Sequence, residues 1–346
     1  EAQRSPFAVR RALAGLGYQE TINFSFVEQR WEQQLAANAN PIKLLNPIAS
    51  QMSVMRSTLL GSLLQVLKFN LDRKAERVRV FELGRVFLRD AAVQNSDTTV
   101  EGLNQPMRVS GVAYGPVTTT TWGGKVRNVD FFDVKGDLEA LLAPLEFKAE
   151  KTEHPALHPG RSAQISIKKR GKDINLGVIG ELHPRWQQAY DIPGSVVLFE
   201  IDWAAIQDIG LPVINTISKF PAVTRDLAVV VDQAVTVTQL QDAMKAAKQL
   251  LVKKIDLFDE FKPTAGRMGG MAENEKSLAF RITLSDESGT LQDAQIEPVI
   301  SSVLDAMSVK CQARIRVQIS AAHSIAQLDQ AIQAFIEVGK ELGVIK

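Results

Sequence analysis

Apolar positions in the first 208 residues recur at spacings that switch between those of helices and those of strands. Ser5 and Pro6 are typical of a helix start, and the helix that they open ends near Leu16. Polar and apolar residues then alternate from 19 to 26, which predicts a half-buried strand. Further helices are expected at 28–37, 57–71 and 130–142, strands at 44–47, 77–88, 107–114, 161–168, 174–180 and 196–202, and a loop at 90–105. Because helices and strands do not alternate regularly, the pattern favours an α+β fold around a largely antiparallel sheet.

A more compact pattern follows a short linker at 209–216. Strands are predicted at 226–232, 252–261, 277–285 and 313–319, with one helix between the first pair and another between the last pair. Thr236 or Thr238 caps the first helix. Thr290 and Asp293 resemble a capping box that opens the second helix, which must absorb Pro298. The order β-α-β-β-α-β predicts a ferredoxin-like domain.

Composition narrows the class of protein. The 346 residues are 45% hydrophobic and 23% charged, which is ordinary for a globular chain of two or three domains. No apolar run approaches the roughly 18 residues of a membrane span, so no membrane partner is expected. The net charge of +1 lacks the basic excess typical of dedicated nucleic-acid binders. Cys311, the only cysteine, excludes an internal disulfide, fits a small buried side chain better than a reactive thiol, and indicates a cytoplasmic location. Because residue 1 is Glu rather than Met, we expect the chain to begin inside a longer product.

Local motifs do not support an autonomous enzyme. The sequence contains no Gly-x-x-x-x-Gly-Lys-Ser/Thr loop and no Gly-x-Gly-x-x-Gly after a strand. His154 and His158 stand four residues apart, but Pro155 and Pro159 exclude the helix that would bring both to one metal ion. His183 is expected to cap or pack at a loop. We therefore assign no catalytic residue and no metal site.

Several short motifs occur in a recognisable order along the chain. They lie at 15–20, 23–26, 45–49, 52–56, 79–87, 132–137, 154–160 and 177–184, and then at 220–228, 257–259 and 276–280. In this order they resemble the C-terminal half of the bacterial phenylalanine–tRNA ligase β subunit. The resemblance covers residues 1 to about 306.

This resemblance implies a division of labour between two kinds of subunit. In that family the α subunit binds ATP and phenylalanine and makes the aminoacyl-adenylate. The β domain that resembles residues 1–208 keeps a class II synthetase fold without working catalytic motifs and packs against α. Residues 217–319 resemble the family's ferredoxin-like anticodon-binding domain. The implied partners are the α subunit, in an α2β2 heterotetramer, and tRNA(Phe). ATP and magnesium are implied for the whole complex, and no cofactor is implied for this chain.

Anticodon binding would depend on a local basic patch, since phosphate contacts dominate affinity for nucleic acid. Between residues 216 and 310, 11 basic and 13 acidic side chains leave a net charge of −2. The candidate RNA-binding residues are Lys219, Arg225, Lys253, Lys254 and Lys276. Arg225 and Lys276 are favoured because they fall inside matching motifs.

Other residues of the same domain have simpler explanations. Lys245 and Lys248 are explained equally well by a solvated helix face and by RNA contact. Phe258 and Phe261 are expected in the hydrophobic core rather than as platforms for exposed bases.

The end of the chain departs from this pattern. Residues 312–323 and 335–343 resemble the C-terminal end of glycine C-acetyltransferase (2-amino-3-ketobutyrate CoA ligase), a pyridoxal-phosphate enzyme. In that family an arginine of this strand, here Arg316, holds the substrate carboxylate, but the cofactor-binding lysine and the other domains are absent. The change indicates a join between 307 and 316 and a foreign tail at 320–346. The strand at 313–319 would close the ferredoxin-like sheet, and an amphipathic helix is predicted at 326–342.

Three hypotheses about function remain open at this point. The leading one is a binding and scaffold portion of the ligase, which docks on α and contacts tRNA. The second is a piece of a pyridoxal-phosphate acyltransferase, which only the tail supports. The third is a folded chimera without activity.

Overall fold

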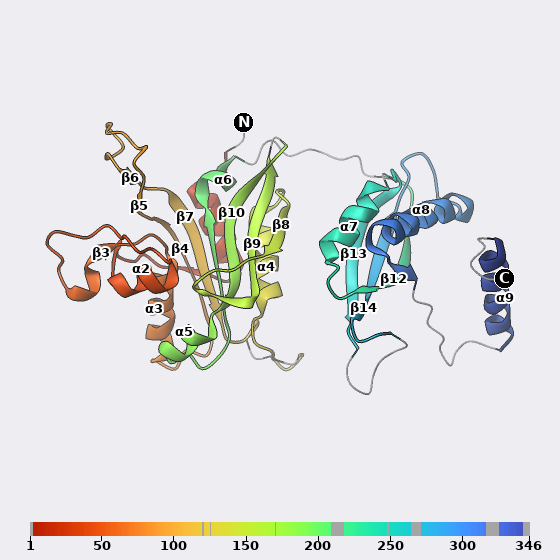
Figure 1. The fold of residues 1–346 in the computed structure, drawn as a ribbon, viewed down its shortest axis with the longest axis horizontal. Coiled ribbons are helices and arrows are strands. Elements are labelled where there is room, and N and C mark those ends of the chain that lie inside the picture. The colour runs from red at the N-terminus through yellow and green to blue at the C-terminus, as the bar shows by residue number, and fades with distance from the viewer. Residues whose placement is uncertain are drawn as a thin grey trace. The chain divides into compact units, whose positions relative to one another are not determined.

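The computed structural model describes residues 3–119, 121–124, 126–169, 171–208, 218–247, 249–263, 271–315 and 325–341 (Figure 1). The chain divides into two compact units, Glu1–Val213 and Ile214–Lys346. Hydrophobic core clusters form separately in each unit. Across the described residues, no helix combines the length and the apolar composition that a bilayer crossing requires.

A seven-stranded sheet is the centre of the first unit. Its order is β1 (Gln19–Glu20), β4 (Val78–Arg85), β7 (Met107–Tyr114), β11 (Val196–Asp202), β10 (Lys172–Leu182), β9 (Leu157–Lys169) and β8 (Phe147–Lys151). Only the pair β1–β4 is parallel. Two further two-stranded antiparallel sheets are present, β2 (Phe26–Val27) with β3 (Val54–Met55) and β5 (Leu88–Arg89) with β6 (Leu103–Asn104).

Helices cover both faces of this sheet, because successive strand residues point to opposite sides. Phe81 belongs to a core with α1 (Pro6–Gly15), α4 (Phe131–Leu142) and α6 (Trp203–Gln207). Val80, its neighbour on β4, belongs to a second core with α2 (Gln29–Leu35), α3 (Leu60–Leu71) and α5 (Pro184–Ala189). A 3₁₀ turn, η1 (Ser50–Met52), precedes β3. The α+β class with a largely antiparallel sheet is therefore confirmed.

Several predicted elements of this unit agree with the structure, and others need correction. The helix at the start begins as predicted, since the Ser5 hydroxyl accepts the Ala8 amide, and strands 107–114 and 196–202 have their predicted bounds. The prediction of a strand at 44–47 is wrong: Leu44 donates one backbone bond to Ser53, and Pro47 has no N–H with which to continue a ladder. The predicted loop at 90–105 contains β6, while β8, α5 and α6 were not predicted.

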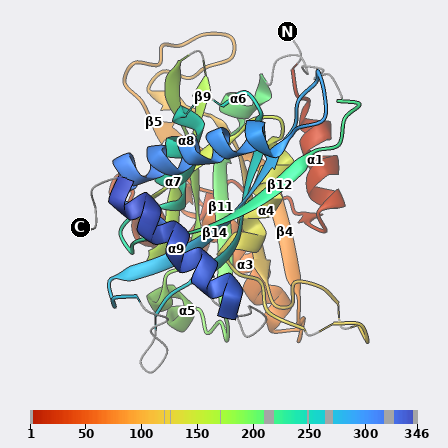
Figure 2. The same cartoon turned by 90° about the vertical axis from the view of Figure 1, so that its right-hand side faces the viewer.

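The second unit has the predicted ferredoxin-like order. Its elements are β12 (Val223–Asp232), α7 (Val237–Ala246), β13 (Val252–Phe261), β14 (Glu275–Leu284), α8 (Asp293–Cys311) and β15 (Arg314–Ile315). The antiparallel sheet has the order β13-β14-β12-β15. Apolar residues of α7 and α8 pack on one face of it (Figure 2).

Helix starts in the second unit show where local signals succeed and fail. Thr236 caps α7 in a capping box with Gln239, as predicted. The capping box predicted from Thr290 and Asp293 is wrong, because the chain enters α8 two residues later, with Gln292 as its cap. Leu291 is buried in the core just before this turn, which fixes the point of entry. Pro298 is accommodated inside the helix.

The C-terminal part of the chain is described in two pieces. Arg314 and Ile315 pair with β12 as the fourth strand, where the sheet was expected to close. Residues 316–319, with Arg316, lie outside the described residues. A helix, α9 (Ile325–Glu341), occupies the stretch where an amphipathic tail helix was predicted.

Candidate protein-docking and nucleic-acid interfaces

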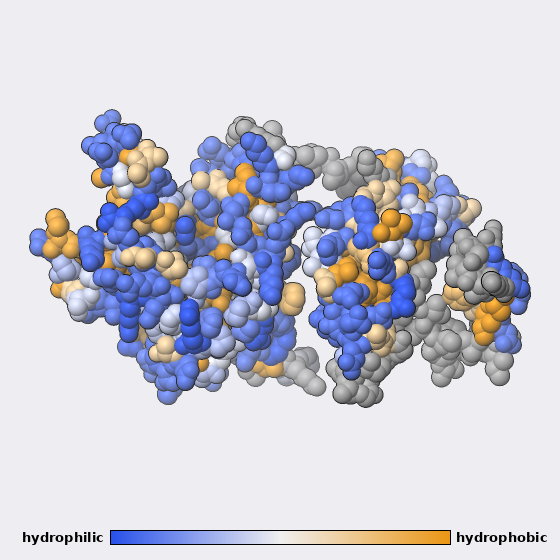
Figure 3. Space-filling model, viewed as in Figure 1, coloured by the Kyte–Doolittle hydropathy of each residue, from blue (hydrophilic) through white to orange (hydrophobic). Residues whose placement is uncertain are grey.

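Four large apolar side chains of the first unit point into solvent and define what we call the apolar patch. They are Ile22, Phe24, Leu45 and Ile48, exposed by 92%, 66%, 98% and 82%. Their two segments lie on either side of β3, since Met55 donates to the Ile42 carbonyl at 2.8 Å and Arg56 donates to the Ser25 carbonyl at 3.0 Å. Orange, hydrophobic surface is visible at this end of the unit, around β3 (Figure 3).

A buried ion pair lies beneath the Ile22–Phe24 part of the apolar patch. Arg56 donates to the Glu82 carboxylate at 2.7 Å, and both side chains are almost fully buried. Asn23 donates to the other oxygen of Glu82 at 2.8 Å. Because Asn23 points inward to this carboxylate, its neighbours Ile22 and Phe24 point outward.

The prediction of a half-buried strand at 19–26 is therefore wrong in two respects. Only 19–20 and 26–27 pair as strands, and the apolar side chains Ile22 and Phe24 are exposed. The alternation is real, but its polar member lies inside. Large apolar side chains as exposed as these make this part of the unit a candidate surface for binding another protein.

Other charged groups of the first unit are likewise used to hold its fold. The Glu32 carboxylate accepts the amide and the hydroxyl of Ser57. Glu200 accepts the Leu59 amide at 2.7 Å and the Thr58 hydroxyl at 2.9 Å, and pairs with Arg108. These acids have their bonds satisfied by the protein, so none is left as a free general base.

Hydrogen bonds of Asp137 hold α4 against the sheet. Asp137 accepts from Arg79 at 2.7 Å and from the Tyr18 hydroxyl at 2.9 Å. Burial of the phenol, followed by the charge of Asp137, raises the pKa of Tyr18 well above its ordinary value.

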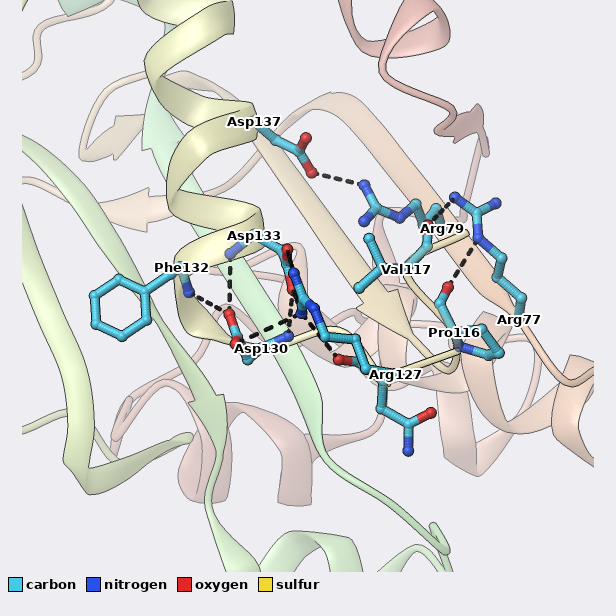
Figure 4. Close-up of polar contacts among 10 residues, drawn as sticks. Arg77, Arg79, Pro116, Val117, Arg127, Asp130, Phe132, Asp133 and Asp137 are labelled. Carbon is cyan, nitrogen blue, oxygen red and sulfur yellow. Dashed lines mark hydrogen bonds and ion pairs between the residues drawn. The ribbon is translucent and has the colours of Figure 1, made fainter. Parts of the chain in front are cut away.

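The hairpin loop beside α4 is anchored at both of its ends (Figure 4). Arg77 donates to the Pro116 carbonyl at 3.1 Å. Arg127 forms two 2.7 Å bonds with Asp133, and these bonds lower the pKa of that carboxyl group.

The histidines act as local caps. His154 accepts the Ala156 amide, His158 accepts the Gly160 amide, and His183 caps α5 as predicted. Burial lowers the pKa of His154 and of His183. In the part of the chain that the structure describes, no three His, Cys, Asp or Glu side chains gather as they would around a metal ion.

Two of the predicted RNA-binding residues are engaged within the domain, one in an ion pair and the other by burial. Arg225 donates to Asp293 in the first turn of α8 at 2.8 Å. Lys276 is buried and pairs in register with Val231 on the helix-covered side of the sheet. This burial lowers the pKa of its ammonium group. The RNA-binding role of both residues stays a prediction, and neither offers an unengaged surface charge.

The other predicted residues are exposed, and two of them flank one turn. Lys219 follows Ser218, whose hydroxyl donates to the Asp286 carbonyl at 2.8 Å. The charge of Lys253 contributes to a lowered pKa of the Asp286 carboxyl group, after the larger effects of hydrogen bonds from Ser288. The structure thus brings Lys219 and Lys253 to the same end of the sheet.

Lys254 follows at the start of β13. It is exposed and forms a 2.9 Å ion pair with Asp256. We call Lys219, Lys253 and Lys254 the lysine end of the sheet. Lys245 is exposed on α7, and Lys248 lies outside the described residues.

Phe258 and Arg281 lie on the side of the sheet opposite the helices, and the sequence analysis selected neither of them for RNA binding. Phe258 is 53% exposed, so its predicted place in the core is wrong, whereas Phe261 is half-buried. A bulge between Leu257 and Asp259 displaces Phe258 from the alternation of β13. The Arg281 guanidinium lies 5.2 Å from its ring centre, which forms an exposed aromatic and cationic surface suited to a stacked base.

Comparison with protein families assigns both units. Residues 1–203 match the family model described as "Phenylalanyl tRNA synthetase beta chain CLM domain". Residues 218–316 match the model described as "Ferredoxin-fold anticodon binding domain". The second match extends about ten residues beyond the limit of 306 that the motifs indicated, and it includes β15. These two models leave 317–346 unmatched, so the glycine C-acetyltransferase resemblance of the tail stays a prediction.

Curated relatives match most of this chain. The phenylalanine–tRNA ligase beta subunit of Burkholderia lata is 54% identical over 320 residues, which are 91% of this chain and 39% of the relative. The beta subunit of Cupriavidus pinatubonensis is 52% identical over 321 residues, 91% of this chain and 39% of the relative. The beta subunit of Chromobacterium violaceum is 47% identical over 317 residues, 92% of this chain and 38% of the relative. The chain therefore spans about two fifths of the length of these relatives.

Proposed function

Because the chain belongs to the phenylalanyl-tRNA synthetase beta chain family, we propose that it serves the attachment of phenylalanine to tRNA(Phe) as a docking and tRNA-contacting part of the β subunit. The observation that carries this proposal is the succession of two matched domains, synthetase-like and then anticodon-binding, on one chain. The engaged carboxylates of the first unit support a scaffold rather than a catalyst. ATP and magnesium would be used by the α subunit of an α2β2 complex in the cytoplasm.

The apolar patch is the proposed docking surface for the α subunit. Its four apolar side chains, Ile22, Phe24, Leu45 and Ile48, are exposed to water in this chain. Their burial against another protein would lower the free energy of the complex. The buried pair of Arg56 and Glu82 holds part of this surface in place before binding, which lowers the ordering cost of association.

The lysine end of the sheet, together with Phe258 and Arg281, is the proposed contact for the tRNA anticodon region. Lysines at the lysine end supply mobile positive charge for phosphates, and Phe258 supplies a ring on which an unpaired base stacks. The domain's net negative charge makes such a local concentration necessary.

Co-expression with a matching α subunit tests the proposal. We expect the two chains to elute together in size-exclusion chromatography and the complex to charge tRNA(Phe) with phenylalanine. The chain alone is expected neither to exchange pyrophosphate with ATP nor to charge tRNA. Failure to co-elute with α would contradict the docking role of this chain.

A matched pair of variants locates the docking surface. Leu45→Asp places a charge in the apolar patch and is expected to weaken the complex at least about tenfold, as charges in interface centres do. Val100→Asp makes the same change at another exposed apolar position of this unit and is expected to leave the complex intact. Equal losses from both variants would mean that α docks elsewhere.

A further inference from the structure

A cavity of about 490 Å³ opens in the first unit, and none of the four apolar patch residues lines it. Its wall includes Arg108 of β7 and Glu200 of β11, with Arg89 of β5 and His154 also on the lining. A volume of this size holds a small organic molecule. Nothing in the docking or RNA-binding roles proposed above uses this cavity.

Hydrogen-bond donors without acceptors converge on the cavity. The Nε atom of Arg89 donates to the Asn40 carbonyl at 3.2 Å, and its two Nη groups have no acceptor among the described residues. Arg108 uses Nη1 for Glu200 and, at 3.5 Å, for the Ser57 carbonyl, which leaves Nη2 without an acceptor in the described part of the chain.

His154 adds a third donor. Its Nδ1 accepts the Ala156 amide at 3.2 Å, so the proton of the neutral ring resides on Nε2. Burial and the nearby Arg108 disfavour the charged ring, although Glu200 opposes this effect, and the net result is a lowered pKa of His154. The Nε2–H group has no acceptor among the residues that the structure describes.

The negative charge of Glu200 does not cancel the positive charge of the cavity. One oxygen of Glu200 pairs with Arg108, and the other accepts the Leu59 amide at 2.7 Å and the Thr58 hydroxyl at 2.9 Å. Glu200 thus neutralises Arg108 and is held by three donors, so Arg89 leaves the cavity with a net positive charge. Two planar guanidinium groups favour ligands that accept paired hydrogen bonds.

We propose that this cavity binds a small anionic molecule through a phosphate or carboxylate group, held by Arg89, Arg108 and His154. The ligand accepts from the free guanidinium donors and from the imidazole N–H, while Thr58 and Leu59 keep Glu200 turned into the wall. None of the residues that line the cavity belongs to the surfaces proposed for α and for tRNA.

Isothermal titration of the full chain at low ionic strength tests this site. Inorganic pyrophosphate is the phosphate probe, citrate is the carboxylate probe, and sodium chloride at equal ionic strength is the blank. We expect saturable binding of at least one probe, with one molecule per chain. Pyrophosphate alone would identify a phosphate-bearing ligand, and citrate alone would identify a carboxylate. No saturable binding of either probe would overturn the proposal.

Two matched variant pairs place the binding in the cavity. Arg89→Gln is expected to weaken binding about tenfold. Arg85→Gln also removes an exposed arginine with one backbone acceptor, the Gln105 carbonyl, and should leave the affinity unchanged because Arg85 lies outside the lining.

His154→Asn keeps an oxygen that can accept the Ala156 amide but removes the ring N–H, so it should also weaken binding. His158→Asn makes the same exchange at the equivalent turn outside the cavity and should have no effect. Unchanged circular dichroism and melting temperature confirm that each variant is folded. Equal losses in the paired variants would show that the anions bind elsewhere and would overturn the assignment.

Discussion

One ion pair of the first unit and one of the second lie in contrasting surroundings. In the first unit, Arg56 and Glu82 form an ion pair that is almost entirely removed from water. In the second unit, Arg281 makes two bonds of 2.7 and 2.8 Å to Asp226, yet both side chains remain about half exposed. Arg281 makes one more bond to its carboxylate than Arg56 does, but the larger difference between the two pairs is their exposure to water.

This difference separates charges that hold the fold from charges that can bind a partner. Breaking a buried pair leaves one ion without water or a counter-ion, so its loss is expensive. An exposed pair is screened by solvent and contributes little to stability, so its members can exchange partners when RNA phosphates arrive. The following predictions test that separation, beginning with the largest expected effect.

Arg56→Met should lower the free energy of unfolding by about 3–5 kcal/mol, because Glu82 would remain buried with only Asn23 as a polar partner. Urea denaturation followed by circular dichroism measures the change. The double variant Arg56→Met/Glu82→Gln should recover much of the loss, since no buried charge is then left unpaired. A loss below about 1 kcal/mol in the single variant would mean that this pair behaves like a surface pair.

Alkaline pH should destabilise the first unit through Tyr18. The pKa of Tyr18 is raised in the folded chain, so above its ordinary value of about 10 the unfolded chain loses the phenol proton first. Stability is therefore full below pH ~10 and falls by about 1.4 kcal/mol per pH unit above it. Urea denaturation at a series of alkaline pH values should show this slope, and Tyr18→Phe should show a shallower one. Equal slopes would disprove the assignment.

Removing two charges from the lysine end should weaken tRNA binding without unfolding the domain. We expect Lys253→Ala/Lys254→Ala to bind tRNA(Phe) several-fold more weakly and to reduce the slope of log affinity against log salt by about 1.5, as two lost phosphate contacts would. Filter binding across a salt series measures both quantities. Lys151→Ala, at an exposed lysine of the first unit, is the control and should change neither quantity.

Arg225→Gln should have the smallest effect. Its ion pair with Asp293 is exposed, so its loss should lower the free energy of unfolding by less than about 1 kcal/mol. Because the Arg225 side chain is only 37% exposed, against 51% for Arg281, we expect tRNA affinity in the same filter assay to stay within experimental error. A loss of tRNA affinity as large as that of the lysine double variant would show that Arg225 contacts the RNA.

Local sequence signals predicted elements whose stability depends on nearby residues. Ser5 and Thr236 cap helices because their hydroxyl groups reach backbone amides within one turn. The strand predicted at 107–114 has the bounds of β7, which lies inside the sheet between the long strands β4 and β11. The ferredoxin-like order was predictable because each of its helices and strands carries a local signal of this kind.

Features that depend on distant residues were not predictable. Asn23 lies inside because Glu82, 59 residues away, accepts its hydrogen bond, and this contact reverses the expected orientation of Ile22 and Phe24. β8 has a polar sequence and exists because it pairs with β9. Lys219 and Lys253 are brought near each other by the turn at Asp286, which no periodicity records.

The bulges of β13 have a consequence for the behaviour of the chain in a crowded solution. This strand forms one edge of the ferredoxin-like sheet, and an open edge is a template on which strands of other molecules can assemble. Its register with β14 shifts at Lys253 and again at Phe258, which interrupts the regular spacing of free backbone groups, and two adjacent lysines repel an incoming copy. The irregularity that exposes the ring of Phe258 thereby also protects the chain against aggregation.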